Sequence, residues 1–122
     1  MTTKAEIGKR GENLVADHLR SIGALILERN WRSGRYEIDI IALKDEYLLF
    51  VEVKTRAVSD WASPEDAIDA SKCRALKRAA LAYMAQSPYR NAEFRFDLAA
   101  VELNPDGSHE LRYTESFLEY HW

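Results

Sequence analysis

Residues 36–56 read YEIDIIALKDEYLLFVEVKTR, two apolar runs on either side of the polar pair Asp45-Glu46. Both runs are rich in β-branched and aromatic residues, and a polar pair between two such runs is typical of an antiparallel hairpin. With a loop of two or four residues, Lys44 faces Tyr47 and the numbers of paired residues sum to 91. The stretch therefore predicts a hairpin and its register.

This register brings acidic residues of the two strands together. Asp39 lies opposite Glu52, and Glu37 lies opposite Lys54, all on one face because side chains alternate along a strand. Cross-strand partners have Cβ atoms only about 5 Å apart, so like charges at such a pair are destabilising unless a cation is bound. A three-residue loop would separate the two acids. The other face is apolar and suited to a core, with Ile38, Ile40, Ala42, Leu49, Val51 and Val53.

Carboxylates in this arrangement suit metal-assisted hydrolysis of phosphodiester bonds. Mg²⁺ or Mn²⁺ held by Asp39 and Glu52 would neutralise phosphoryl charge and help to generate hydroxide. The backbone carbonyl of Val53 is a candidate third ligand, and Glu37 could ligate a second ion. Lys54, one pleat from Glu52, could orient or activate the attacking water. The alternative interpretation is a solvated hairpin face that carries an ordinary salt bridge between Glu37 and Lys54.

The rest of the pattern predicts a mixed α/β fold. Thr3 and Glu6 match a helix capping box, Gly23 suits a helix C-cap, and Asp69 suits the N-cap of a second helix. The expected elements are a helix over 3–23, a strand over 24–27, a basic loop over 30–35, strands over 36–43 and 47–55, a loop over 57–65, a helix over 69–86, and strands over 94–103 and 110–114. The order α-β-β-β-α-β-β gives a mixed five-stranded sheet flanked by helices.

Composition predicts a cytoplasmic protein of one domain. The 122 residues are enough for a single core, so residues 1–122 are expected to fold as one unit. No apolar run is long enough to cross a membrane, and the lone Cys73 excludes an intramolecular disulfide framework. The net charge is −3, yet residues 1–90 hold fifteen basic and thirteen acidic residues. A basic surface for nucleic acid is therefore compatible with the acidic total.

Motifs beyond the two acids extend this interpretation. They are Gly8-x-x-Gly11-Glu12, Asn30-Trp31-Arg32, residues 37–42, residues 50–56, Lys72, and Arg95-Phe96-Asp97. Together they resemble the YraN family of small bacterial proteins, from Gly8 to about Phe117. The Asp…Glu-x-Lys signature is similar to that of restriction-endonuclease-like nucleases and archaeal Holliday-junction resolvases. The family usually has Gly before Glu-Ile-Asp, where this chain has Tyr36, which could narrow the approach of a substrate or stack on a base.

The resemblance implies a restriction-endonuclease-like core with a catalytic set of Glu12, Asp39, Glu52 and Lys54. It adds Glu12 as a further candidate metal ligand beside Asp39 and Glu52, with Mg²⁺ or Mn²⁺ as the cofactor. The implied function is a metal-dependent nuclease with DNA as the expected substrate, and branched DNA as a candidate by analogy. The alternative function is a non-catalytic nucleic-acid-binding or adaptor protein that keeps the nuclease fold.

Basic side chains near such a site could bind flanking phosphates or could simply be solubilising charges. The candidates are Arg32, Arg35, Arg56 and Lys72. The other basic residues of the second helix, Arg74, Lys77 and Arg78, are interpreted as a solvated face. Symmetric cleavage of two strands would need a homodimer, for which the aromatic tail of Phe117, Tyr120 and Trp122 offers a surface.

Overall fold

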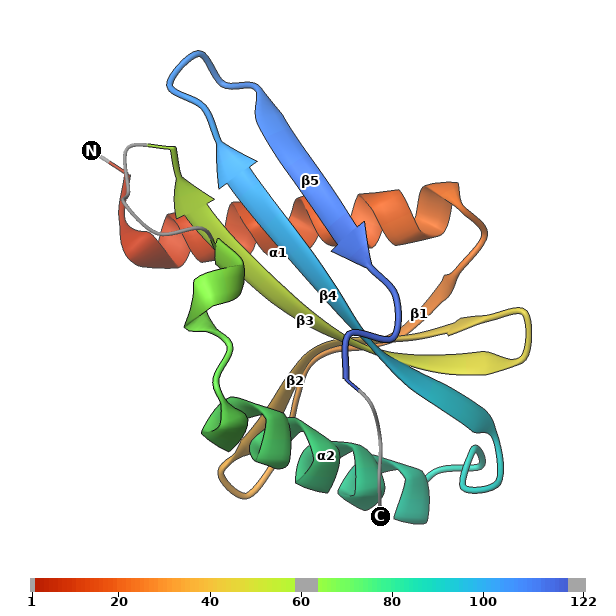
Figure 1. Cartoon of the computed structure of the whole chain (residues 1–122). Helices are drawn as coiled ribbons and strands as arrows, with labels where there is room; N and C mark the ends of the chain where they lie inside the picture. The colour runs from red at the N-terminus through yellow and green to blue at the C-terminus, as the bar shows by residue number, and fades with distance from the viewer. Residues whose placement is uncertain (1, 59–63, 119–122) are drawn as a thin grey trace.

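The computed structural model of the chain describes residues 2–58 and 64–118. It confirms the predicted order α-β-β-β-α-β-β and shows a five-stranded mixed sheet between two helices (Figure 1). The elements are α1 (Lys4–Ser21), β1 (Leu25–Ser33), β2 (Tyr36–Lys44), β3 (Tyr47–Ala57), the 3₁₀ turn η1 (Pro64–Ala67), α2 (Ala70–Ala85), β4 (Glu93–Leu103) and β5 (His109–Thr114). The strands follow one another across the sheet in chain order. β3 and β4 are parallel, and the other neighbours are antiparallel.

Both helices begin at the predicted caps. The hydroxyl oxygen of Thr3 accepts a hydrogen bond from the backbone N–H of Glu6 at 3.1 Å. The carboxylate of Asp69 accepts one from the backbone N–H of Lys72 at 2.8 Å. Each cap satisfies an N–H that has no partner within the first turn of its helix. The second cap fixes where α2 starts, and so where Lys72 lies relative to the sheet.

The sheet has a hydrophobic core on each face, one under α1 and one under α2 (Figure 1). The α1 core includes Val15, Ala16, Leu19, Ile40, Ala42, Leu49, Val51, Val53, Ala99 and Val101. The α2 core includes Ile38, Ile41, Leu48, Phe50, Leu76, Ala79, Ala80, Tyr83 and Phe96. Trp31 packs on the α2 core with its ring edge-on to Tyr83, at a centroid distance of 5.2 Å. Both faces of β3 and β4 are thus buried, as in sheets covered on both sides.

The hairpin of β2 and β3 has the predicted two-residue loop. Asp45 and Glu46 have positive φ angles of 50° and 70°, which is the conformation of a type I′ turn. Lys44 pairs with Tyr47, and the predicted register holds for five successive pairs. The local sequence was therefore sufficient to predict this part of the sheet.

β1 extends further than predicted. The sequence predicts a strand that ends near residue 27, whereas β1 continues to Ser33 and pairs with β2. The ladder shifts register between Ile26 and Glu28, and Asn30 has a φ of 53°. These irregularities break the alternation that marks a strand, so the second half of β1 resembles a basic loop in sequence.

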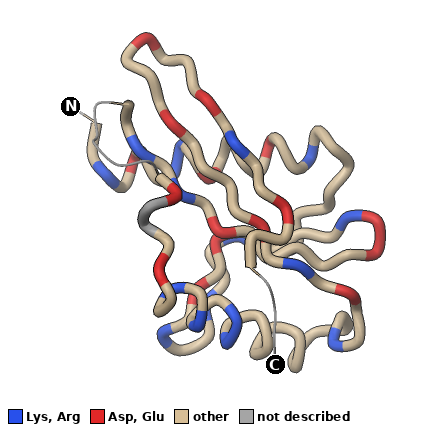
Figure 2. The backbone as a smooth tube through the Cα atoms, viewed as in Figure 1, with Lys and Arg blue, Asp and Glu red and all other residues tan. Residues whose placement is uncertain are grey.

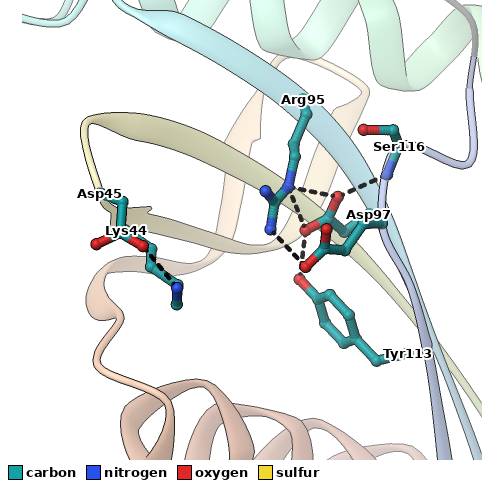
Figure 3. Close-up of polar contacts among 7 residues, drawn as sticks. Lys44, Asp45, Arg95, Asp97, Tyr113 and Ser116 are labelled. Carbon is teal, nitrogen blue, oxygen red and sulfur yellow. Dashed lines mark hydrogen bonds and ion pairs between the residues drawn. The ribbon is translucent and has the colours of Figure 1, made fainter.

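A buried carboxylate ties β4 to the segment after β5 (Figure 3). Asp97 accepts hydrogen bonds from Arg95 Nε at 3.0 Å, from Tyr113 Oη at 2.6 Å and from the backbone N–H of Ser116 at 3.0 Å. These donors compensate for removing the Asp97 charge from water. Arg95 and Asp97 of the Arg95-Phe96-Asp97 motif thus form a salt bridge that holds β4 to the segment after β5.

One expectation concerns a part of the chain outside this description. Tyr120 and Trp122, which belong to the proposed dimer surface, lie outside residues 2–58 and 64–118. Within those ranges, no helix is long and apolar enough to span a membrane.

Candidate functional site

The ladder between β2 and β3 ends where the predicted acidic pair begins. The last paired residues are Ile40 and Val51. The next pair in the register, Asp39 with Glu52, is replaced by a side-chain contact, in which the Asp39 carboxylate accepts the backbone N–H of Val53 at 2.8 Å. Asp39 therefore occupies the gap at the point where the two strands separate.

The predicted single face for all the site residues is wrong. Ile38 packs in the core under α2, whereas Ile40 packs in the core under α1. Strict alternation would put both side chains on the same face of the sheet. The alternation of side chains along β2 is therefore interrupted at Asp39. The prediction failed because it extended the regular hairpin through the position where the ladder stops.

Glu37 is separated from its predicted partner by this change. Its carboxylate lies 3.3 Å from Nη2 of Arg32, which is its cross-strand neighbour in β1. The expected pairing with Lys54 across the hairpin is therefore wrong. Arg32, a predicted phosphate ligand, is paired with an acid instead.

Glu52 is the buried centre of the site. Its side chain is 2% exposed, and its Oε1 lies 3.7 Å from Nζ of Lys54 and 3.5 Å from Nζ of Lys72. Its Oε2 is buried without a hydrogen-bond partner in the described part of the chain. Burial, together with the adjacent Asp39 carboxylate, raises the pKa of Glu52 to about 8, against the two lysine charges that lower it. A buried carboxylate oxygen without a donor needs a proton or a cation.

Glu12 approaches Asp39 from α1. Burial and the Asp39 charge raise the pKa of Glu12, and a hydrogen bond from Asn30 and the charge of Arg29 oppose that shift. Arg29 Nη2 lies 3.9 Å from the Glu12 carboxylate. Asn30 lies in the Asn30-Trp31-Arg32 motif, but the sequence alone indicated no role for Asn30 or for Arg29 beside Glu12. Both depend on the unpredicted second half of β1.

An open cleft gives access to Glu12. Its volume is about 670 Å³, and it lies between α1 and β1. Ala5, Gly8, Lys9, Glu12, Asn13, Arg29 and Asn30 line it. Glu12 is thus reachable from solvent on the α1 side, and Asp39 and Glu52 are not among the residues that line this cleft.

Gly11 determines how closely α1 lies on the sheet. A Cβ atom at this position would lie 1.8 Å from Oγ1 of Thr55 and 2.7 Å from the Thr55 Cβ. A residue without a side chain is therefore required at this crossing. Gly8, one turn earlier, has nothing within 4 Å of such an atom. The close approach at Gly11 is what carries the adjacent Glu12 to Asp39.

Two carboxylates, and not a larger cage, form the candidate metal site. Within residues 2–58 and 64–118, no group of three or more His, Cys, Asp or Glu side chains is arranged to hold an ion. Asp39 and Glu52 nevertheless suit Mg²⁺, which keeps several waters and is bound through one or two carboxylates plus substrate phosphates. The buried Oε2 of Glu52 is an available donor atom for such an ion.

Of the predicted phosphate ligands, Lys72 contacts the acidic pair, with its Nζ 3.5 Å from Glu52 Oε1. Arg56 lies in β3 opposite Glu102 of β4. The guanidinium of Arg35 lies over the ring of Tyr36, with its carbon 5.8 Å from the ring centroid. The contacts of these residues thus differ from one to the next.

We expect metal-free protein to lose stability as the pH rises from about 4.5 to about 8. In that window the folded state keeps a proton on Glu52 that the unfolded chain releases, so the folded state binds more protons and stability falls with pH. Urea unfolding in the presence of a chelator, between about pH 5 and pH 8, measures the slope of the free energy of unfolding against pH. Glu52→Gln should flatten it, and Glu93→Gln, at an exposed position, should not. An unchanged slope in Glu52→Gln would contradict the assignment.

Sequence comparisons give the site a family context. Residues 11–101 match the model of a family described as "Uncharacterised protein family UPF0102". A UPF0102 protein of Bacteroides thetaiotaomicron is 44% identical over 101 residues, which cover 83% of each chain. One of Flavobacterium johnsoniae is 38% identical over an alignment of 128 positions that covers 100% of both chains. One of Chloroherpeton thalassium is 39% identical over 85% of this chain and 81% of the relative. These matches confirm the family resemblance seen in the motifs, and the names state no activity.

Proposed function

The chain belongs to the uncharacterised protein family UPF0102, and from the geometry of its site we propose that it is a divalent-metal-dependent nuclease. The proposed reaction is hydrolysis of phosphodiester bonds, with DNA as the substrate. Branched or otherwise structured DNA is the first substrate to test. The proposed site residues are Glu12, Asp39, Glu52 and Lys54. The contact of Lys72 with Glu52 supports including Lys72 as well.

One observation carries the proposal. Glu52 is almost fully buried beside a second carboxylate, and one of its oxygens has no donor among the described residues. Burying one acid beside a second, half-buried carboxylate is unfavourable unless something compensates for their charge. In a purely structural site we would expect hydrogen-bond donors on every oxygen, as on the buried Asp97.

The chain supplies carboxylates to bind a metal ion and ammonium groups to contact the phosphate or the attacking water. Asp39 and Glu52 would hold Mg²⁺ or Mn²⁺, which when bound neutralises phosphoryl charge and acidifies a water. The ammonium groups of Lys54 and Lys72, which lie 3.7 Å and 3.5 Å from Glu52 Oε1, can donate hydrogen bonds to a phosphoryl oxygen or orient the attacking water. Glu12 adds negative charge on the α1 side, where a second cation or a water would be attracted.

A direct assay tests the proposal. Purified protein is incubated with linear duplex, single-stranded and four-way branched DNA, with Mg²⁺ or Mn²⁺ and with excess chelator. We expect products only when the metal is present, with the branched substrate compared against the linear duplex of the same sequence. Cleavage at an equal rate in chelator would contradict the proposal, and so would the absence of cleavage of every substrate with both metals.

Nucleic-acid binding without cleavage is the second candidate. It is favoured by the contact of Glu52 with two lysines, which could compensate for its charge without a metal. In that case DNA binding should weaken with salt, and added metal should leave the DNA intact. Asp39→Asn would then leave binding unchanged.

A further inference from the structure

A second concave site lies beside α2, at the turn that joins β1 to β2. We call it the arginine pocket, and it is lined by Arg35, Tyr36, Ser71, Arg74, Ala75 and Arg78. Its volume is about 360 Å³. Figure 2 shows basic residues gathered along α2 and the adjacent turn. Asp39 and Glu52 are not among the lining residues, so the pocket is separate from the candidate metal site.

The charge of the arginine pocket is not compensated by nearby acids. In the described ranges, no carboxylate lies within 4.0 Å of the guanidinium groups of Arg35, Arg74 or Arg78. Other arginines differ, since Arg32 and Arg95 each form an ion pair. Three guanidinium groups around one concavity repel one another unless an anion lies between them.

Tyr36 organises two of these three arginines. Arg78 Nη1 donates a hydrogen bond to the Tyr36 hydroxyl at 3.2 Å, and Arg35 lies over the Tyr36 ring. Arg78 and Arg35 together lower the pKa of the Tyr36 hydroxyl, which agrees with a strongly positive surrounding. Tyr36 also packs on the core under α2, so its ring has a fixed position at the pocket wall. The residue that replaces the usual Gly of the motif is therefore part of this pocket.

We propose that the arginine pocket binds a phosphate group of the nucleic-acid strand whose cleavage is proposed above. This inference rests on that proposed function. Guanidinium groups bind phosphate oxygens through paired N–H donors, and the hydroxyl of Ser71 offers a further donor. Lys72, which contacts Glu52, directly follows Ser71 in α2. The first turns of α2 thus connect the metal site to the pocket, and a strand that follows this path would be held at two points.

The test is a binding measurement in chelator, where cleavage cannot interfere. Fluorescence anisotropy with labelled single-stranded and duplex oligonucleotides is recorded over a range of salt concentrations. We expect Arg74→Gln/Arg78→Gln to raise Kd by about tenfold or more. The magnitude of the slope of log K against log salt should fall by about one unit, because the pocket without these arginines no longer neutralises its phosphate. The matched control is Arg20→Gln, an exposed arginine paired only with Asp17 among the described residues, and it should leave both quantities unchanged.

Two further measurements separate the outcomes. Inorganic phosphate should shift the backbone amide NMR signals near Ser71 in the wild-type protein and not in the double variant. Oligonucleotides with and without a 5′-phosphate show whether the pocket takes a strand phosphate or a terminal one. Equal Kd and salt slope for the double variant and Arg20→Gln would overturn the proposal. DNA binding that needs the arginines, without cleavage by wild-type protein, would overturn the nuclease function alone.

Discussion

Gly11→Ala should destabilise the protein by about 3 kcal/mol, although alanine is the better helix former. The added Cβ would lie 1.8 Å from Oγ1 of Thr55 and 2.7 Å from both its Cβ and Cγ2. Thr55 belongs to β3, a central strand, so its Cβ atom cannot move away without shifting α1 or the sheet. Urea unfolding of wild-type and variant protein measures the loss.

The matched control is Gly8→Ala in the same helix. A Cβ at Gly8 has nothing within 4 Å, so this change should stabilise the protein by up to about 1 kcal/mol through helix propensity. The two alanine variants should therefore change stability in opposite directions. A double variant of Gly11→Ala with Thr55→Gly removes all three clashing atoms. It should lose less stability than the sum of the losses in the two single variants. Equal stability of the two alanine variants would show that α1 does not cross β3 as closely as described.

The sequence predicted the hairpin register because the determinants are local. Asp45 and Glu46 form the two-residue loop, and the apolar alternation next to the loop orients both strands. β1 could not be predicted in the same way. The register shift beside Leu27 and the left-handed conformation of Asn30 follow from its pairing with β2, which a single strand pattern does not contain.

The proximity of Asp39 and Glu52 was predictable, and the arrangement of the residues around them was not. The motif pointed to Asp39 and Glu52, and the structure places them beside one another. Their relation is set by the Asp39 carboxylate bonding to Val53 N–H, which ends the ladder and moves Glu37 to the other face. A side chain that replaces a backbone partner leaves no periodic signal in the sequence.

Basic residues were the least predictable part of the molecule. Lys72 reaches Glu52 because α2 follows β3 and is capped by Asp69, which sequence spacing alone does not place in three dimensions. Arg74 and Arg78 have the i,i+4 spacing of an ordinary solvated face. They become a pocket only through the turn between β1 and β2, which contributes Arg35.

Asp39→Asn should lower nuclease activity by about a thousandfold. Metal ions supply several kcal/mol of transition-state stabilisation, and each 1.36 kcal/mol corresponds to about tenfold in rate. The asparagine oxygen can still accept the N–H of Val53, so the fold and the strand separation are retained. Asp17→Asn, at a position where the side chain is 75% exposed, is the control and should keep full activity. Initial rates of DNA cleavage in Mg²⁺ and Mn²⁺ measure the effect, and activity above about a tenth of wild type in Asp39→Asn would contradict the ligand assignment.

The same variant separates a metal site from a structural acidic pair without any activity assay. If Asp39 and Glu52 bind Mn²⁺, the ion should stabilise wild-type protein by mass action, by about 2.7 kcal/mol at a hundredfold excess over Kd, and so raise its thermal midpoint. Asp39→Asn should lose this shift, and its metal-free form should be at least as stable as wild type, because the charge next to buried Glu52 is removed. If instead the variant is stabilised and Mn²⁺ shifts the thermal midpoint of neither protein, the two acids bind no metal and only destabilise the fold by their repulsion. The thermal midpoint of the metal-free protein therefore reports on repulsion between the two carboxylates. The shift of the midpoint on adding Mn²⁺ reports on metal binding, because binding requires carboxylate oxygens that are free to ligate the ion.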